Sequence, residues 1–183
     1  MEKNRLEAFS DGILAIIITI MILELSQPLG DGFRDLAALM PTFWAYILSY
    51  AFIAIYWVNH HHIFHDAEAV NVKILWCNIA WLFIMSFIPF ATAWVGTYPV
   101  SRAPLTFYFA DMALASIAFH LMYYLIFTEG GDRKKFRLGI RSIMSLLVYS
   151  LAAVFGWLCP AAAYIAVTAV SLWWIVPIRD AAE

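Results

Sequence analysis

Six long apolar stretches follow one another along this chain of 183 residues, separated by short segments rich in polar residues, glycine and proline. A helix needs about 20 mostly apolar residues to cross a membrane, and each stretch approaches that length. The pattern therefore predicts an all-α, polytopic membrane protein whose single domain, residues 1–183, has six transmembrane helices. The stretches cover residues 6–28, 36–60, 73–97, 104–127, 138–158 and 161–178.

The first stretch carries two carboxylates that distinguish it from a signal peptide. Asp11 opens its apolar run, Glu24 closes it, and no small-residue cleavage site follows, so we expect this helix to be retained. The twelve residues between them cover about 18 Å of a hydrocarbon core about 30 Å thick. Because a charge at membrane depth costs at least about 2.5 kcal/mol, the carboxylates should face protein or water, unless both snorkel to the two interfaces of a tilted helix.

One face of the first helix has a distinctive composition. Gly12, Ile16, Thr19 and Leu23 are spaced 4, 3 and 4 residues apart and form a narrow stripe at 100° per residue. Repeated around a symmetry axis, the stripe would give apolar rings with a ring of hydroxyls between them, and such rings can close a pore by dewetting. The alternative is ordinary helix packing, with Gly12 and Thr19 as small-residue contacts.

Composition and charge agree with a membrane protein. Hydrophobic residues make up 64% of the chain and charged residues only 13%, whereas soluble domains usually carry about 25% charged residues. The net charge is −2 and the basic residues lie in short loops, so no basic surface is available for nucleic acid. Cys77 and Cys159 lie inside apolar stretches and lack the spacing of a metal site or a disulfide scaffold.

The distribution of lysine and arginine predicts an orientation. Arg34 and Arg102 would lie on one side of the membrane and nine basic residues on the other, which places both termini in the cytoplasm. The run 132–135 reads as a solvated cytoplasmic loop that also contacts anionic membrane lipids. The nine residues are Lys3, Arg5, Lys73, Arg133, Lys134, Lys135, Arg137, Arg141 and Arg179.

The second stretch ends in four histidines, His60, His61, His62 and His65. His61 and His65 are four residues apart on one helical face, a spacing that can ligate a metal or a haem. No Cys, Asp or Glu in the membrane part of this helix completes such a site, so we expect no metal and no cofactor. Hydrogen bonds to neighbouring helices are the favoured reading, and proton sensing is a further alternative.

Other polar residues lie within the later stretches. We expect Asn78 to form a hydrogen bond across helices and Pro89 to kink the third helix by removing a backbone donor. Asp111 and His120 in the fourth helix read as interior hydrogen-bonding groups without a transport role. No catalytic motif is present, so the protein is not expected to be an enzyme.

Several motifs resemble the bacterial branch of the endolysosomal potassium channel family, transmembrane protein 175. Arg5, Phe9, Ser10 and Asp11 match an RxxxFSD signature at the start of the first helix. The resemblance covers roughly residues 5–93. Within it Trp57, His60, His61 and Phe64 fit a WxxHHxxF pattern, and Leu75 to Asn78 with Pro89, Phe90 and Thr92 resemble the third helix.

The resemblance implies a passive, potassium-selective channel of the bacterial cytoplasmic membrane, with potassium as the permeant ion. Because this chain holds one six-helix repeat, it would form a homotetramer whose four first helices line the pore. Ile16 then corresponds to the narrowest ring, Thr19 to the polar layer linked to selectivity and Leu23 to the next apolar ring, with Gly12 also lining the pore. Arg5, Ser10 and Asp11, with Trp57 and either His60 or His61, would hold the pore helix in place.

Two other functions compete with a channel. A proton- or ion-coupled secondary transporter would use Asp11, Glu24, Asp111 and His120 as a relay, but such transporters often show inverted repeats with broken helices, and none is found between residues 1–97 and 98–183. A membrane redox protein would bind haem or metal through the four histidines. Flux measurements separate the first alternative from a channel, and an absorbance spectrum separates the second.

Overall fold

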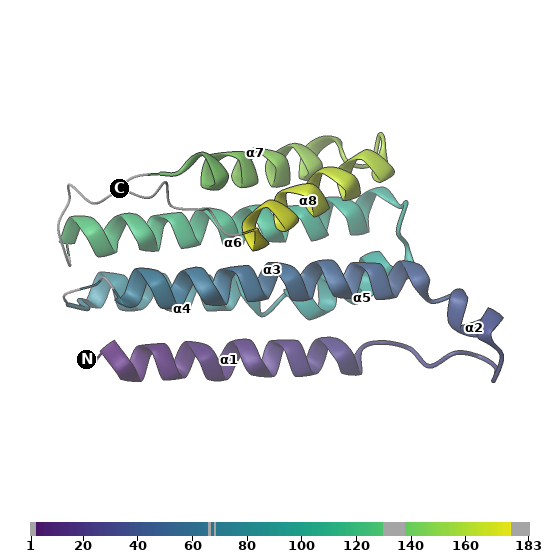
Figure 1. The fold of residues 1–183 in the computed structure, drawn as a ribbon, viewed down its shortest axis with the longest axis horizontal. Coiled ribbons are helices and arrows are strands. Elements are labelled where there is room, and N and C mark those ends of the chain that lie inside the picture. The colour runs from purple at the N-terminus through teal and green to yellow at the C-terminus, as the bar shows by residue number, and fades with distance from the viewer. Residues whose placement is uncertain (1–2, 66, 68, 130–137, 177–183) are drawn as a thin grey trace.

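The protein is all-helical over the residues described by the computed structural model, which are 3–65, 67, 69–129 and 138–176 (Figure 1). Its long helices run side by side along the long axis of the molecule. The helices are α1 (Lys3–Leu23), α2 (Phe33–Ala37), α3 (Met40–His65), α4 (Val72–Met85), α5 (Ile88–Thr97), α6 (Arg102–Glu129), α7 (Ile140–Phe155) and α8 (Pro160–Ile175).

Four of the six predicted spans are long and apolar enough to cross a membrane: α1, α3, α6, and the segment Val72–Thr97 that contains α4 and α5. The helices α7 and α8 are apolar but have only 16 residues each, or about 24 Å. Gly139 and Gly156 cap the two ends of α7, and Pro160 begins α8. The predicted sixth span reaches 178, and residues 177–178 lie outside the described part of the chain.

The first helix ends earlier than the apolar pattern predicts. It stops at Leu23 and not at residue 28. The backbone N–H of Leu25 bonds to the oxygen of Ile22 at 3.3 Å, which tightens the last turn. Pro28 then disfavours a helical conformation for the residue before it. Glu24 therefore lies directly beyond the end of α1.

The predicted distortion at Pro89 is a break between two helices. Helix α4 ends at Met85 and α5 starts at Ile88, with Pro89 in the first turn of α5. Proline is tolerated there because the first N–H groups of a helix have no partner inside it. The Ser86 hydroxyl donates to the Phe83 oxygen at 2.6 Å and satisfies one carbonyl at the break.

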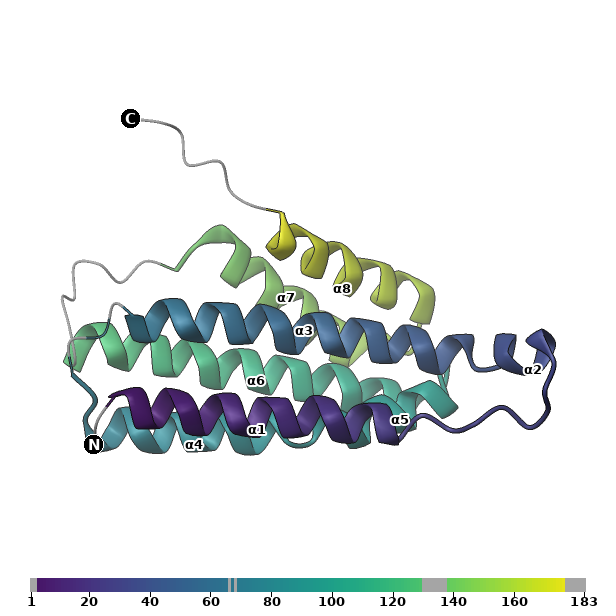
Figure 2. The same cartoon turned by 60° about the horizontal axis from the view of Figure 1, so that its bottom comes forward.

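The helices form a bundle with α1 at one edge and the α7–α8 hairpin on the other side (Figures 1 and 2). Helix α1 contacts α3, α4 and α5, α6 contacts α4, α5 and α7, and α8 contacts α7 and α3. The largest fully buried side chains include Trp81, Tyr108 and Phe52.

Close contacts and a hydroxyl cluster join α3, α5 and α6 inside this bundle. The Ser49 hydroxyl lies 2.7 Å from that of Thr92 and 2.8 Å from that of Tyr108, and all three residues are buried. The Thr42 hydroxyl donates to the oxygen of Gly96 at 3.1 Å. A side chain on Gly96 would start 2.9 Å from the Thr42 Cα, so glycine permits this approach.

The described basic residues lie at both ends of the bundle. Lys3 and Arg5 begin α1 at the end where Lys73 begins α4, whereas Arg34 and Arg102 lie in helices at the opposite end (Figure 1). Five of the nine basic residues on which the orientation depends lie outside the described residues. These are Arg133, Lys134, Lys135, Arg137 and Arg179.

Candidate functional site

The candidate site is the face of α1 that the rest of the chain leaves uncovered. The opposite face packs into the bundle through Leu6, Ser10, Leu14, Ile17 and Met21. The predicted stripe lies on the uncovered side: Ile16 is 59% exposed and Leu23 is 77% exposed, and Gly12 and Thr19 are also exposed.

The small residues of the stripe do not pack against other helices of the same chain. A Cβ atom added to Gly12 would meet no atom within 4 Å. The hydroxyl of Thr19 donates to the oxygen of Ala15 at 2.9 Å, within α1 itself. Its proton is therefore used in that bond, and its oxygen lone pairs remain available as acceptors. This geometry does not support small-residue packing within the subunit and leaves the stripe free to contact lipid, water or another copy.

A buried polar network fixes the other side of α1. Asn78 of α4 donates through Nδ2 to the Ser10 hydroxyl at 3.0 Å, and its Oδ1 lies 2.9 Å from Nε2 of His60 in α3. Because Oδ1 can only accept, Nε2 of His60 carries the proton. The Ser10 hydroxyl in turn donates to the Leu6 oxygen at 2.9 Å. All three network residues are at most 1% exposed, so three helices share one satisfied polar cluster.

A second set of contacts binds α1 to α3 near the start of α1. The indole N–H of Trp57 donates to the Asp11 carboxylate at 2.9 Å. One turn before Asp11 on α1, a carboxylate oxygen of Glu7 lies 3.9 Å from Nδ1 of His61. The ammonium of Lys3 donates to the backbone oxygens of His65 at 3.2 Å and Ala67 at 3.3 Å. The orientation of α1 about its own axis is therefore set by polar contacts.

The signature residues divide into two groups in the structure. Ser10 and Asp11 contact Asn78 and Trp57, as the resemblance implies. His60 makes the buried contact, whereas the His61 side chain is 68% exposed. Among the described residues, neither Arg5 nor Phe9 joins the network: Arg5 is exposed and Phe9 is 53% exposed.

Sequence reasoning missed Trp81. Its ring stacks on His60, with 5.2 Å between ring centroids and an interplanar angle of 16°. Trp81 follows Asn78 by three residues and so lies on the same face of α4. That spacing is the signal that could have identified it.

The residues of the relay that a transporter would need lie in two separate parts of the bundle. Asp11 and Glu24 are exposed at or beyond the ends of the apolar part of α1, whereas Asp111 and His120 belong to α6. Asp111 is 6% exposed and its Oδ2 has no hydrogen-bond partner among the described residues. Nδ1 of His120 lies 2.6 Å from the oxygen of Ser116. No hydrogen bond between described residues connects the two pairs.

The histidines of α3 point to different surroundings. His60 is buried against Asn78, and His61 faces Glu7. Within the part of the chain that the structure describes, no three His, Cys, Asp or Glu side chains are placed to hold a metal ion together.

Comparisons with known proteins agree with the motifs. Residues 5–89 match the family described as endosomal/lysosomal potassium channel TMEM175. The chain is 40% identical to Potassium channel HX13_20290 of a Chryseobacterium species, over 97% of this chain and 94% of that protein. It is also 32% identical to Potassium channel B446_29190 of Streptomyces collinus, over 70% of this chain and 66% of that protein.

The fold matches a solved channel over nearly its whole length. That protein is a lysosomal potassium-selective channel TMEM175 homolog from Chamaesiphon minutus, seen in a crystal structure. The TM-score is 0.76 at 27% identity, and the match covers 96% of this chain and 99% of that one. The resemblance found in the motifs of α1, α3 and α4 is thus confirmed by whole-length similarity, and the chain belongs to the bacterial branch of the TMEM175 channel family.

Proposed function

We propose that this chain is the subunit of a homotetrameric potassium channel of the bacterial cytoplasmic membrane, with four copies of α1 around the pore. The observation that carries the proposal is the uncovered stripe of Gly12, Ile16, Thr19 and Leu23 on a helix whose opposite face is locked by buried hydrogen bonds. A helix held in one rotation about its axis can present the same four side chains to a symmetry axis in every subunit.

In the proposed topology the chain crosses the membrane six times, with both termini in the cytoplasm. Helices α7 and α8 supply the last two crossings. Each helix is about 24 Å long. The turn that joins them contains apolar residues such as Trp157 and Leu158, which extend the apolar part of each crossing. Small differences between helix length and membrane thickness are accommodated at modest cost by local thinning of the bilayer.

Conduction in this proposal passes a hydrophobic constriction at Ile16. A ring of four isoleucines offers no oxygen to replace the hydration shell of potassium, so the ion is only partly dehydrated there. One turn further, Thr19 offers hydroxyl oxygens whose lone pairs remain available, since the proton is donated to Ala15. Such a pore gives a moderate preference for potassium over sodium and not the strong selectivity of a carbonyl filter.

The main test measures oligomeric state and current on the same purified protein. Particles in detergent or nanodiscs should contain four subunits, and reconstituted protein should carry single-channel current down a potassium gradient without a proton gradient. A lone subunit, or slow flux that requires a proton gradient, would contradict the channel and favour a coupled transporter.

A sharper test addresses Thr19. The change Thr19→Ala should lower the permeability ratio of potassium to sodium, measured from reversal potentials. Thr97→Ala is the matched control, because Thr97 is also exposed and its hydroxyl also donates four residues back, to Ala93 at 2.9 Å. An unchanged ratio in Thr19→Ala would reject this role for the hydroxyl ring.

A further inference from the structure

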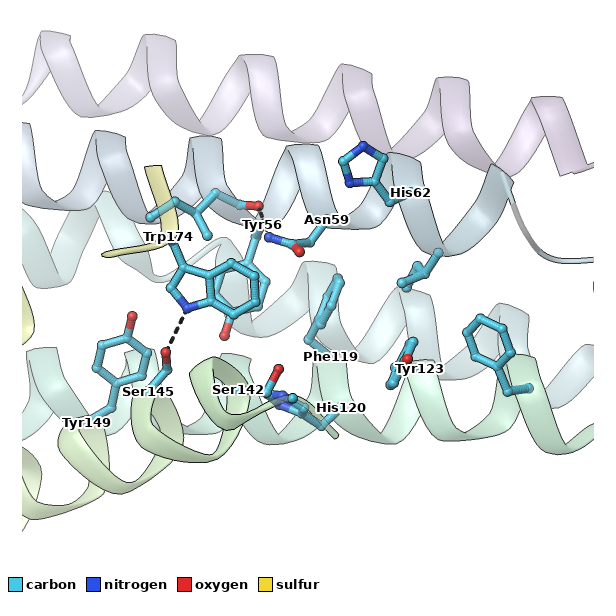
Figure 3. A pocket seen from close by; sticks show the side chains of 14 residues that line it. Tyr56, Asn59, His62, Phe119, His120, Tyr123, Ser142, Ser145, Tyr149 and Trp174 are labelled. Atoms are coloured by element: carbon cyan, nitrogen blue, oxygen red, sulfur yellow. Dashed lines mark hydrogen bonds between the residues drawn. The ribbon is translucent and has the colours of Figure 1, made fainter. Parts of the chain in front are cut away.

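A cavity of about 370 Å³ lies on the side of α3 that faces away from α1 (Figure 3). Its walls come from α3, α6, α7 and the end of α8. Tyr56 and Tyr149, both buried, line it together with the partly exposed Asn59 and the exposed His62 and Gly139. Asn59 and His62 belong to the last turns of α3 and Gly139 precedes α7, so the exposed part of the cavity lies toward the end of the bundle where α1 begins. The volume falls within the range of small-ligand pockets, about 300–1,000 Å³.

The lining combines aromatic walls with uncharged hydrogen-bonding groups. Phe119 and Phe127 contribute apolar surface, and Asn59, Ser142 and His120 contribute polar groups. Nδ1 of His120 lies 2.6 Å from the Ser116 oxygen, so Nδ1 carries the proton of the neutral imidazole and Nε2 is an acceptor.

None of the described residues that line the cavity is Asp, Glu, Lys or Arg. A charged head group held between these walls would lose hydration without gaining a countercharge from the described lining, which costs several kcal/mol. A neutral ligand with one hydroxyl group avoids this cost and can use both a donor and an acceptor of the wall. The lining chemistry therefore selects an uncharged amphiphile with a hydroxyl head and an apolar body.

The cavity wall is connected to α1 by direct contacts. Tyr56 and Phe119 line the cavity and also contact the buried ring of Trp81, at 6.1 Å and 5.6 Å between ring centroids. Trp81 stacks on His60, which bonds to Asn78, which bonds to Ser10 of α1. A ligand that moves Tyr56 or Phe119 thus displaces a packed chain of side chains that ends on the helix carrying Ile16.

We propose that this cavity is a binding site for a neutral, hydroxyl-bearing amphiphile, and that its occupancy alters conduction through Trp81 and the polar network of α1. The binding part stands on the cavity alone. The effect on conduction rests on the proposed channel function.

Binding is tested by photolabelling the purified full chain in liposomes with a diazirine derivative of 1-octanol. Saturable labelling should map to cavity residues of α3, α6 or α7. Diazirine derivatives of octanoic acid and octylamine should label the same residues about tenfold less at equal concentration, because an unpaired charge costs more than about 1.4 kcal/mol. Equal labelling by a charged derivative, or no saturable labelling in the cavity, would overturn the proposal.

A filling substitution provides the second readout. Ser142→Trp should abolish the labelling, while Ser150→Trp, on the same helix but outside the cavity, should leave it unchanged. If Ser142→Trp does not yield folded protein by size-exclusion chromatography, Asn59→Phe fills the cavity from α3 and should have the same effect. Full labelling of a folded filled variant would contradict the site.

The effect on conduction is measured separately in planar bilayers. Octanol should change the potassium current of the parent, and the same concentration should have no effect on a filled variant that still conducts. A conducting parent that is labelled in the cavity but shows no change in current would overturn the coupling to α1. A parent without any current would contradict the proposed channel, while the labelling result would still decide whether the site exists.

Discussion

The N-terminal block of α1, α3, α4 and α5 and the C-terminal hairpin of α7 and α8 are held in place by different kinds of contact. In the block, buried hydrogen bonds join separate helices, as between Ser10, Asn78 and His60 and between Ser49 and Thr92. In the hairpin, Trp174 of α8 donates to the Ser145 hydroxyl of α7 at 2.8 Å in a bond that is only partly buried. The buried Tyr149 of α7 also forms a hydrogen bond with the Ser171 hydroxyl of α8.

This difference matters because lipid is as apolar as a leucine side chain. Burying apolar surface between helices therefore gives little preference for one rotation of a helix over another, and hydrogen bonds and close backbone contacts provide it. The block has both, which suits the part of the molecule that positions α1. The hairpin has fewer, and the cavity of about 370 Å³ lies where it meets α3 and α6.

The largest effect is expected from a steric change inside the block. In Gly96→Ala the added Cβ would lie 2.8 Å from Cγ2 and 2.9 Å from Cα of Thr42, so α5 and α3 must separate. Overpacking of this kind costs about 1–3 kcal/mol. The midpoint of thermal denaturation in detergent should fall clearly. Gly12→Ala is the control, because its Cβ meets no atom, and equal midpoints for the two variants would contradict the close contact.

The next largest effect is expected when the polar network of α1 is removed. Asn78→Leu leaves the His60 Nε2 proton buried without an acceptor, at a cost of about 1–3 kcal/mol. The Ser10 oxygen loses the donor from Asn78, although its own proton still bonds to the Leu6 oxygen. The thermal midpoint should fall, and the potassium current should change because α1 loses its fixed rotation. Adding Ser10→Ala should cost less than it does in the parent, since the partner is already absent. Fully additive losses would show that the two side chains do not interact.

A smaller effect is expected at the exposed edge of the same block. Trp57→Phe removes the hydrogen bond to Asp11, and because Trp57 is 49% exposed, water can replace the donor. The loss should be about 0.5–1.5 kcal/mol. Trp76→Phe makes the same change at a position that is 65% exposed and should leave the thermal midpoint unchanged. A midpoint for Trp57→Phe equal to that control would mean that the bond to Asp11 contributes nothing.

Much of the block could be predicted from its residues. The apolar lengths predicted the long helices, and Pro89 predicted a kink at the place where the structure has a break between α4 and α5. The 4, 3 and 4 spacing of the stripe on α1 placed its four residues on one face, and the structure leaves that face exposed. These features depend on local geometry, which the sequence specifies directly. The pore role of that face stays a prediction.

Other features depend on contacts between distant segments and could not be predicted. Hydropathy cannot tell how far α7 and α8 extend, because Gly156 caps the end of α7 and Pro160 begins α8 within a segment that remains apolar. The choice between His60 and His61 depends on which face of α3 meets Asn78, and an apolar helix gives no periodic signal for that. The cavity forms where α3, α6, α7 and α8 meet, so it can be recognised only when the positions of all four helices are known.

The smallest effect is expected in the hairpin, at Trp174→Phe. The change removes an indole donor that lies 2.8 Å from the Ser145 hydroxyl. Ser145 still donates to the oxygen of Arg141 at 2.7 Å, so no buried donor is left unsatisfied. The loss should be at most about 0.5 kcal/mol, below the expected effect of Trp57→Phe. Trp174 also lines the cavity, and the replacement keeps an aromatic side chain in that wall. The variant should therefore still be labelled by the octanol probe. A fall in thermal midpoint as large as that of Asn78→Leu would mean that polar contacts fix the hairpin as firmly as the block, and the contrast between the two regions would no longer hold.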